Sequence, residues 1–490
     1  MRLADLIAGL DAHLAAPGNS DQAASFGALE IPAITQDSRL VRRGMMFGAI
    51  PGSKLDGGTF IADAVAKGAA AVLATPGTAV PASIALVETA QPRRLVAQLA
   101  VRLAGSLPRE IVAITGTNGK TSGADFLRQI WEFSNLPAAS IGTLGILVRD
   151  QPPRPCLTTP DPVTLAHELA ALARGGIDHV VIEASSHGLD QARLDGVPLS
   201  AGGFTNLTRD HLDYHGDMAS YAAAKLRLFE ELLPAGAPAI ATTALDATVM
   251  DQLREIAARR GLRFETVGEG GSLIDLVRAT PTAFGQILNL TTPEGPIEVA
   301  LPLAGGYQAD NVLMAAGLAL ALETQNVLDA LPNLRGVRGR LELIARLPER
   351  GAVYVDYAHT PDALTRMIQS LRPHCAGKLI LVFGAGGDRD AGKRPLMGAV
   401  AQALADVAII TDDNPRSENP AAIRAAIKIA CPKGIQIGDR RQAIAAALQM
   451  VSDDDLVVVA GKGHEPGQIV GNVTLPFDDA TVIRELLGLS

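Results

Sequence analysis

The stretch Ile111-Val112-Ala113-Ile114-Thr115-Gly116-Thr117-Asn118-Gly119-Lys120-Thr121 decides how the chain is interpreted. A run of branched apolar residues enters a glycine-containing loop, and a helical pattern follows as far as Trp131. In such a strand–loop–helix unit, backbone N–H groups and the helix N-terminus hold phosphate oxygens. The Lys contacts the outer phosphates, and the Thr hydroxyl ligates Mg²⁺. The general pattern has Gly at position 114, where this chain has Ile114, so a glycine-rich turn without function is the alternative. The predicted nucleotide-binding residues are Gly116, Thr117, Asn118, Gly119, Lys120, Thr121 and Ser122.

Outward from this loop, short apolar runs alternate with helical patterns, which is typical of a parallel α/β sheet. Each run ends at polar or glycine residues, where ligands gather in parallel sheets. A helical stretch over 93–103 precedes the first of these runs. The predicted strands are 111–114, 180–183, 203–206, 353–356, 379–383, 407–411 and 456–460.

Length and composition predict a multidomain protein of ordinary solubility. The 490 residues suggest about three domains, and we place them at 1–88, 89–337 and 338–490. The net charge of −9 without a basic stripe argues against nucleic-acid binding. Three scattered cysteines indicate neither disulfides nor a zinc site. Residues 1–16 interrupt their apolar run with two aspartates, so they predict an amphipathic helix and no secretory signal.

Two segments beyond the phosphate loop carry dense chemistry. Glu183 ends a predicted strand, where a P-loop enzyme places a metal-directed carboxylate. The segment 206–215 packs two His and two Asp into the six residues 210–215, and solvated loop residues are the alternative. Lys225 follows in a helical stretch, and its surroundings in the sequence predict a solvated lysine.

Six motifs in order resemble those of the Mur ligases, the family that builds the peptide of the bacterial cell-wall precursor. They extend over nearly the whole chain, and a chance match of all six in register is not a reasonable alternative. The motifs are Thr-Gly-Thr-Asn-Gly-Lys-Thr at 115–121, Glu-Ala-Ser-Ser-His-Gly-Leu at 183–189, Asn-Leu-Thr-Arg-Asp-His-Leu-Asp-Tyr-His at 206–215, Gly-Arg-Leu-Glu at 339–342, Asp-Tyr-Ala-His-Thr-Pro at 356–361 and Gly-Lys-Gly-His-Glu at 461–465.

The resemblance implies a fold and a reaction. The expected fold is α/β with a small N-terminal UDP-binding domain, a central P-loop-type parallel-sheet ATPase domain and a C-terminal Rossmann-like domain. The expected enzyme is a cytoplasmic, monomeric ligase without a membrane span that uses ATP and Mg²⁺. It phosphorylates a carboxylate, and an amine then attacks the acyl phosphate.

The resemblance also assigns roles to residues. Lys120, Glu183, His211 and Lys225 are implied to be catalytic, and Lys225 matches a lysine that the family carbamylates. Metal ligation is implied for Thr121, Glu183, His211 and Lys225. Asn311 and Arg340 match residues that grip ATP, with Asp356 and His359 nearby, while Tyr307-Gln308 departs from the Phe-Asn common in the family.

The last domain is implied to bind the incoming amino acid. Asp413-Asn414-Pro415-Arg416 resembles the family's motif for meso-diaminopimelate, whose distal carboxylate needs a cation such as an Arg fork. A tight turn with a surface Arg is the alternative. The diaminopimelate residues implied are Arg389, Asp413, Asn414, Pro415, Arg416, Gly461 and Glu465.

The co-substrate is implied to be a UDP-linked muramoyl dipeptide. Its residues would be Ser38, Thr158, Thr159, Ser185, Gln191, Arg193 and Lys225. A lysine-adding, dipeptide-adding or folate-linked ligase, a UDP-sugar binding module and a P-loop regulatory ATPase are the alternatives. A regulatory ATPase would leave the motifs at 206–215, 356–361 and 413–416 unused.

Overall fold

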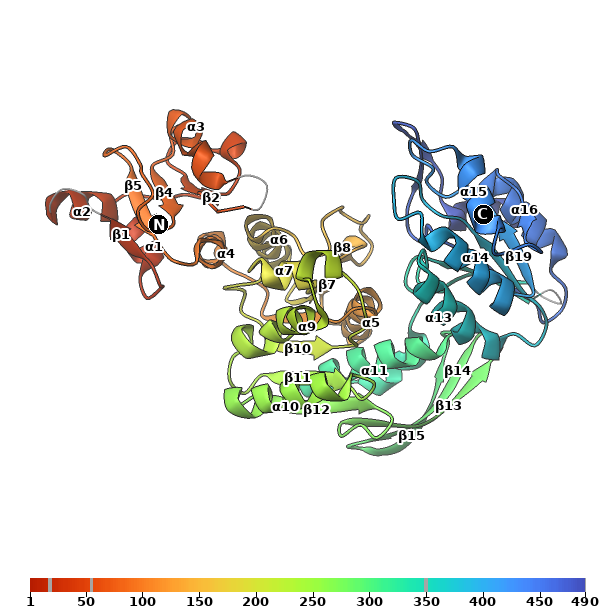
Figure 1. Cartoon of the computed structure of the whole chain (residues 1–490). Coiled ribbons are helices and arrows are strands. Elements are labelled where there is room, and N and C mark those ends of the chain that lie inside the picture. Colours follow the sequence, from red (N-terminus) through yellow and green to blue (C-terminus); the bar gives the residue numbers. More distant parts are fainter. Residues whose placement is uncertain (16–19, 53–55, 348–350, 490) are drawn as a thin grey trace. The chain divides into compact units, whose positions relative to one another are not determined.

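The computed structural model describes residues 1–15, 20–52, 56–347 and 351–489 (Figure 1). The chain forms two compact units. The first consists of Met1–Thr266 and Gly317–Gln325, and the second of Val267–Ala316 and Asn326–Ser490. In the described part of the chain, no helix is long and apolar enough to cross a membrane.

The first unit begins with a five-stranded sheet in the order β1-β5-β4-β3-β2. Its strands are β1 (His13–Ala15), β2 (Ile34–Thr35), β3 (Met46–Gly48), β4 (Ala71–Ala74) and β5 (Ala85–Glu88). The strands are parallel except β1, which pairs with β5 in antiparallel fashion. The helices are α1 (Leu3–Ile7), α2 (Ser20–Gly27), α3 (Ile61–Ala66) and α4 (Pro92–Ala104).

The amphipathic helix predicted over 1–16 is wrong beyond its first turns. Helix α1 ends at Ile7, and Gly9 adopts a left-handed φ of +72° that a continuing helix excludes. Leu14 instead pairs with Val87 in the sheet, so tertiary pairing overrides the local helical pattern. Ala16 lies outside the described residues.

The second sheet of this unit carries the phosphate loop. It is part of a ten-stranded sheet, in which these strands follow the order β12-β11-β10-β6-β9-β7-β8, with β6 (Glu110–Thr115) between β9 (His179–Glu183) and β10 (Ala201–Phe204), both parallel to it. The other strands are β7 (Ala138–Gly142), β8 (Gly145–Val148), β11 (Pro238–Thr242) and β12 (Arg263–Gly268). The helices are α5 (Lys120–Phe133), α6 (Pro162–Arg174), α7 (Ser186–Asp190), α8 (Leu212–His215), α9 (Met218–Arg227) and α10 (Ala247–Arg260).

The strands predicted at 111–114 and 180–183 are confirmed, and the helical stretch over 93–103 is α4. Strand β10 ends at Phe204, two residues before the predicted end. The physical reason is that Thr205 and Asn206 bond to the phosphate loop: Thr205 Oγ1 donates to Asn118 O at 2.6 Å, and Asn118 N donates to Asn206 Oδ1 at 2.9 Å.

The second unit contains an antiparallel meander followed by a six-stranded sheet. The meander consists of β13 (Ile274–Thr282), β14 (Gly285–Thr292) and β15 (Gly295–Leu301). The sheet, in the order β16-β17-β21-β18-β19-β20, consists of β16 (Glu342–Leu347), β17 (Gly351–Asp356), β18 (Leu379–Phe383), β19 (Val407–Ile410), β20 (Ile435–Gln436) and β21 (Leu456–Ala460). Only β16 pairs in antiparallel fashion, with β17. The sequence predicted four of these strands.

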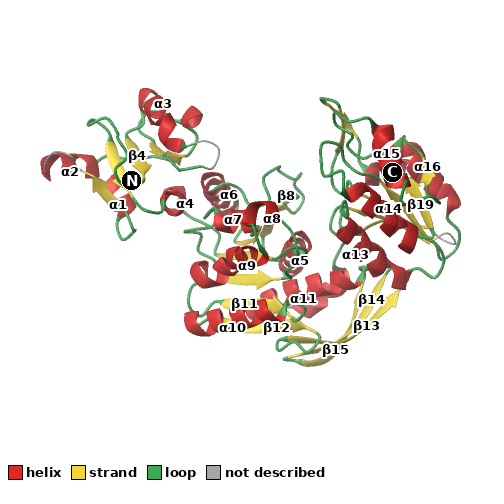
Figure 2. Ribbon diagram, viewed as in Figure 1, coloured by secondary structure: helices red, strands yellow, loops and turns green. Residues whose placement is uncertain are grey.

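The six-stranded sheet is buried on both faces. Along β18, Leu381 packs in one apolar cluster and its neighbour Val382 in another, as expected for a parallel sheet with helices on each side. Figure 2 shows the helices α13 to α16 next to this sheet. The helices of this unit include α11 (Gly306–Ala321, which continues into the first unit), α12 (Val327–Ala330), α13 (Pro361–Leu371), α14 (Lys393–Leu404), α15 (Pro420–Lys428), α16 (Arg440–Met450) and α17 (Asp479–Leu487), and a hairpin pairs β22 (Gly467–Val470) with β23 (Val473–Pro476).

Candidate active site

The phosphate loop connects the end of β6 to the start of α5. Gly116 has φ +144°, and a Cβ there would lie 1.9 Å from Thr205 Oγ1, so only glycine fits. Gly119 adopts φ +83° directly before the helix. Lys120 folds back over the loop, where its Nζ donates to Gly116 O at 2.8 Å and to Thr117 O at 2.9 Å. Ser122 lies buried in the first turn of α5. This geometry is that of an anion-binding loop at a helix N-terminus.

A buried carboxylate lies beside the loop. Glu183, 2% exposed at the end of β9, accepts from Thr121 Oγ1 at 2.8 Å and from Thr143 N at 2.7 Å. A Cβ on Gly142 would meet Glu183 Oε1 at 1.9 Å, so the strand is shaped around this group. Hydroxyl and carboxylate oxygens are hard ligands that suit Mg²⁺.

Few protein side chains near the phosphate loop could ligate a metal ion. Within the described residues, no three His, Cys, Asp or Glu side chains gather as a metal site. Mg²⁺ commonly takes one or two protein oxygens and completes its shell with phosphate and water, so Thr121 and Glu183 are sufficient protein ligands for it.

Lys225 is buried on α9, with 1% of its surface exposed. The prediction of a solvated helix lysine is therefore wrong, because the face of α9 that carries Lys225 is turned toward the phosphate loop. Lys225 Nζ donates to Gly116 O at 2.7 Å, the same carbonyl that accepts from Lys120. Burial and the charge of Lys120 lower the pKa of Lys225 well below its ordinary value. A lowered pKa favours the neutral form of the amine over the ammonium.

Aromatic and imidazole rings gather beside these lysines. The rings of His187 and His211 lie 5.0 Å apart, and those of His187 and Tyr214 lie 4.1 Å apart. His211 takes a left-handed φ of +52° just before α8. His187 lies in the motif at 183–189 but was assigned no role, because the sequence around a single histidine does not show which distant side chains will contact it.

Five of the residues predicted for the muramoyl dipeptide are linked to Glu183 by contacts, and they are Thr158, Thr159, Ser185, Gln191 and Arg193. Arg193 Nη1 donates to Thr159 O at 2.6 Å, and Arg193 Nη2 donates to Gln191 Oε1 at 2.8 Å. The hydroxyl oxygens of Thr159 and Ser185 are 2.9 Å apart. Thr158 Oγ1 lies 3.1 Å from Thr143 Oγ1, and Thr143 also bonds to Glu183. The structure thus connects the predicted substrate residues to the predicted metal carboxylate.

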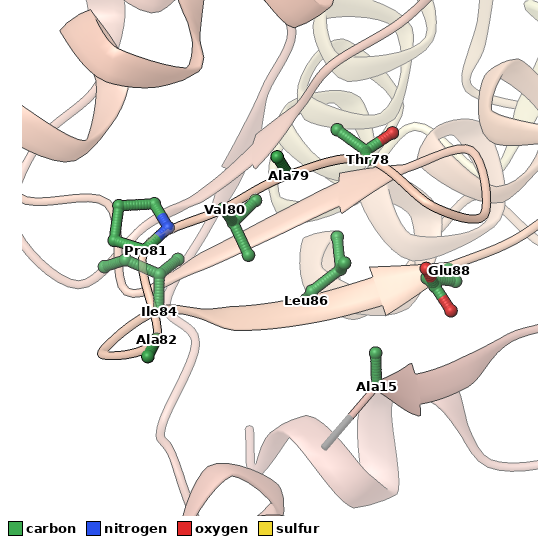
Figure 3. A pocket seen from close by; sticks show the side chains of 9 residues that line it. All are labelled: Ala15, Thr78, Ala79, Val80, Pro81, Ala82, Ile84, Leu86 and Glu88. Carbon is green, nitrogen blue, oxygen red and sulfur yellow. The ribbon is translucent and has the colours of Figure 1, made fainter. Parts of the chain in front are cut away.

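Ser38 lies in the N-terminal sheet, apart from that group. It is buried in a single 3₁₀ turn after β2, and Lys67 Nζ donates to its carbonyl at 3.1 Å. A cavity of about 340 Å³ lies at the opposite edge of the same sheet. Figure 3 shows its lining, which is Ala15, Thr78, Ala79, Val80, Pro81, Ala82, Ile84, Leu86 and Glu88. Since β1 and β5 form this cavity, it is separate from the Ser38 turn.

In the second unit, the residues predicted to grip ATP form one chain of contacts. Asn311 Nδ2 donates to Gln308 Oε1 at 3.2 Å, and Gln308 Nε2 donates to Arg340 O at 3.0 Å. The Arg340 guanidinium lies over the Tyr357 ring at 4.7 Å. Asp356 accepts from Leu341 N at 2.8 Å. Gln308, part of the Tyr307-Gln308 departure from the family pattern, therefore holds the backbone of Arg340.

Three loops of the six-stranded sheet, those after β18, β19 and β21, meet at its carboxyl edge. Asn414 Nδ2 donates to Glu465 Oε2 at 2.8 Å, and Arg416 Nη1 donates to Gly387 O at 2.8 Å. Asp413 is buried, and a Cβ on Gly461 would lie 2.6 Å from its Oδ2. The Pro415 carbonyl packs against Gly387, where a Cβ would come within 1.9 Å.

Arg389 belongs to the same loop as Gly387, and its side chain is exposed. The structure thus brings together, from three separate motifs, the residues predicted to bind diaminopimelate. It also shows that Lys462, which lies in the motif at 461–465 but was assigned no role, is buried next to Asn414 and Glu465.

The strand–loop–helix unit, the buried carboxylate and the paired lysines define a P-loop nucleotide-dependent enzyme. Three family models match the chain: "Mur ligase family, catalytic domain" over residues 30–105, "Mur ligase middle domain" over 114–319, and "Mur ligase, glutamate ligase domain" over 339–463. The chain belongs to the Mur ligase family, whose members form amide bonds at the expense of ATP.

The relatives are similar over nearly their whole length. The chain is 52% identical to the UDP-N-acetylmuramoyl-L-alanyl-D-glutamate–2,6-diaminopimelate ligase of Caulobacter vibrioides, over 94% of this chain and 96% of that one. It is 47% identical to the ligase of the same name from Rhizobium meliloti, over 100% of both chains. A solved structure of a ligase with this name has a TM-score of 0.76 at 31% identity, covering 100% of this chain and 99% of the other.

Proposed function

We propose that this chain is an ATP-dependent ligase that joins meso-diaminopimelate to UDP-N-acetylmuramoyl-L-alanyl-D-glutamate. The observation that carries the proposal is the loop after β19, where Asn414 contacts Glu465 and Arg416 is held against Gly387. A guanidinium there suits the distal carboxylate of diaminopimelate, which lysine lacks. The relatives named above carry the same activity in their names.

The proposed reaction begins with transfer of the γ-phosphoryl group of ATP to the D-glutamate carboxylate. Two anions must approach each other, so fixed cations have to offset their repulsion. Lys120 and the loop N–H groups would hold the phosphates. Mg²⁺, held by Thr121 and Glu183, would supply further charge neutralisation. The amine of diaminopimelate then attacks the acyl phosphate, forming the amide and releasing phosphate.

Lys225 is the proposed carbamylated residue. Its low pKa and burial against Gly116 favour the neutral amine that reacts with carbon dioxide. The product is an anion with two oxygens, which together with His211 would hold a second Mg²⁺.

Further features complete the proposal. Ser38 would contact the UDP moiety, and Thr158, Thr159, Ser185, Gln191 and Arg193 the muramoyl dipeptide. Asn311 and Arg340 would contact ATP. We place the domain boundaries at 1–88, 89–337 and 338–490, and expect a cytoplasmic monomer. The phosphate groups are bound in local sites, since the net charge of −9 opposes general polyanion binding.

The test is phosphate release with Mg–ATP and the UDP-linked dipeptide, comparing meso-diaminopimelate with L-lysine. Release that depends on diaminopimelate, with a new tripeptide product, is expected. Release with lysine instead would keep the ligase and overturn the role of Arg416. Release that ignores both amino acids would indicate a regulatory ATPase.

A further inference from the structure

Lys462, in the loop after β21, is completely buried, with 0% of its surface exposed. Its Nζ donates to Asn414 Oδ1 at 3.3 Å, to Glu465 Oε2 at 3.3 Å and to the carbonyl of Gly467. An ammonium has three N–H donors and no acceptor, and each donor has one oxygen here. A buried charge is tolerated when it is paired and hydrogen-bonded in this way.

The lysine fixes the orientation of the Asn414 amide. Asn414 Oδ1 accepts from Lys462 Nζ and from Ile469 N at 2.9 Å, while Nδ2 donates to Glu465 Oε2 at 2.8 Å. A flipped amide would direct its NH₂ group at two donors, which is unfavourable. Asn414 therefore has one orientation.

This arrangement leaves two polar groups without a hydrogen-bond partner in the part of the chain that the structure describes. Among the described residues, the second N–H of Asn414 Nδ2 and Oε1 of Glu465 make no hydrogen bond. The first can donate to a carboxylate, and the second can accept from an ammonium. A donor and an anionic acceptor side by side match the zwitterionic end of an amino acid.

We propose that Lys462 is a positioning residue for the incoming amino acid: its buried ammonium locks Asn414 and Glu465 into the orientation that receives the substrate's carboxylate and ammonium. This inference rests on the proposed function, because the ligand it positions is diaminopimelate. Lys462 itself has no exposed surface and does not contact the substrate.

A purely structural role is the competing explanation, since Lys462 also bonds to Gly467 at the base of the β22–β23 hairpin. That role predicts a general loss of stability and of turnover. A positioning role predicts a selective rise in the KM of the amino acid, because losing one charged hydrogen bond costs about 1.5–3 kcal/mol.

The experiment compares Lys462→Met and Lys462→Gln with Lys433→Met, a control that removes an exposed lysine from the same unit. The wild-type enzyme is first shown to ligate diaminopimelate; if it does not, the proposed function fails and the positioning of this substrate falls with it. With wild-type activity in hand, Lys462→Met should raise the KM for diaminopimelate about tenfold to a hundredfold. The KM values for ATP and the UDP-linked dipeptide should change less than twofold, as should all three in Lys433→Met.

A second readout is the coupling of Lys462 to Glu465. Glu465→Gln should raise the same KM, and adding Lys462→Met to it should have much less than the additive effect, because both act through one carboxylate. An unchanged KM for diaminopimelate in Lys462→Met, an equal rise for all three substrates, or full additivity would overturn the proposal. Failure of both Lys462 variants to fold would make the lysine structural and would overturn it as well.

Discussion

At the scale of single residues, the clearest difference between the structure and the sequence-based expectations is the burial of several ionisable side chains. Lys225, Lys462, Glu183 and Asp356 are all buried, although each belongs to a residue type that usually faces water. Each makes hydrogen bonds to backbone or side-chain groups of a predicted site. Buried ionisable groups that are hydrogen-bonded in this way are more frequent at functional sites than elsewhere in a protein.

Lys225→Ala should abolish most ligase activity while the fold persists. The reason is that the proposed carbamate, formed on an amine whose pKa is lowered, is lost with the side chain. Adding acetate or another small carboxylate should restore part of the phosphate release, since it can occupy the vacated space. A variant that folds, as judged by circular dichroism, and stays inactive with every carboxylate tested would contradict the carbamate.

Asp310 should make the stability of the second unit depend on pH. Burial and repulsion by Glu269 raise the pKa of Asp310 to about 6, above its unfolded value of about 4. The folded state therefore binds the proton more tightly, and stability is highest below pH 4 and falls as the pH rises toward 6. A shift of about two units corresponds to about 3 kcal/mol.

Asp310→Asn should accordingly raise the thermal midpoint at pH 7.5 and leave it nearly unchanged at pH 4. The exposed Asp453→Asn serves as a control that should change neither value. Equal midpoints for Asp310→Asn and wild type at pH 7.5 would show that Asp310 ionises without cost.

At the scale of elements, the loops after parallel strands assemble both candidate sites. Strands β6 and β9 end at the phosphate loop and Glu183, and β18, β19 and β21 end at the three loops that meet around Asn414. This is where parallel α/β sheets bind ligands. The strand interiors are apolar and buried. The positions of the site residues therefore depend on the contacts that fix the ends of the strands.

The ion pair between Arg440 and Asp479 should fix the end of β21. Both side chains are 0% exposed, and Arg440 Nη2 also donates to Ala460 O at 3.0 Å, directly before Gly461. The pair connects the starts of α16 and α17 to the end of β21. Removing one partner leaves a buried charge, so Asp479→Ala should destabilise the protein by about 3–5 kcal/mol.

The double variant Arg440→Met/Asp479→Ala should recover part of that loss, because no unpaired charge remains. Thermal unfolding of the three variants measures this. A double variant less stable than Asp479→Ala would show that Arg440 acts mainly through its backbone contacts.

At the scale of the whole molecule, the residues proposed for UDP and for the distal carboxylate of diaminopimelate belong to different parts of the chain. Ser38 lies in the first compact unit and Arg416 in the second. Because they belong to different units and are proposed to bind different substrates, we expect their substitutions to act independently. Arg416→Ala should raise the KM for diaminopimelate about tenfold to a hundredfold, and Ser38→Ala should raise the KM for the UDP-linked dipeptide about fivefold.

In the double variant, the losses in transition-state stabilisation should add to within about 0.5 kcal/mol. Steady-state kinetics of both single variants and the double variant test this. An unchanged KM for diaminopimelate in Arg416→Ala would remove Arg416 from the amino-acid site, and strong non-additivity would show that the two sites are coupled.

The amino-acid sequence by itself determined the phosphate loop, the main parallel strands and the family. These features are local: an apolar run, the glycines at 116 and 119 and the residues that follow are contiguous, so their pattern can be read directly. The antiparallel meander of β13 to β15 was not predicted, since pairing between strands is set by contacts that propensity does not specify.

Only the tertiary structure decided that Lys225 is buried against Gly116, 109 residues away, and that Lys462 bonds to Asn414. The physical reason is that burial depends on which distant segments pack together, and a side chain's neighbours in space set its charge state and its hydrogen bonds.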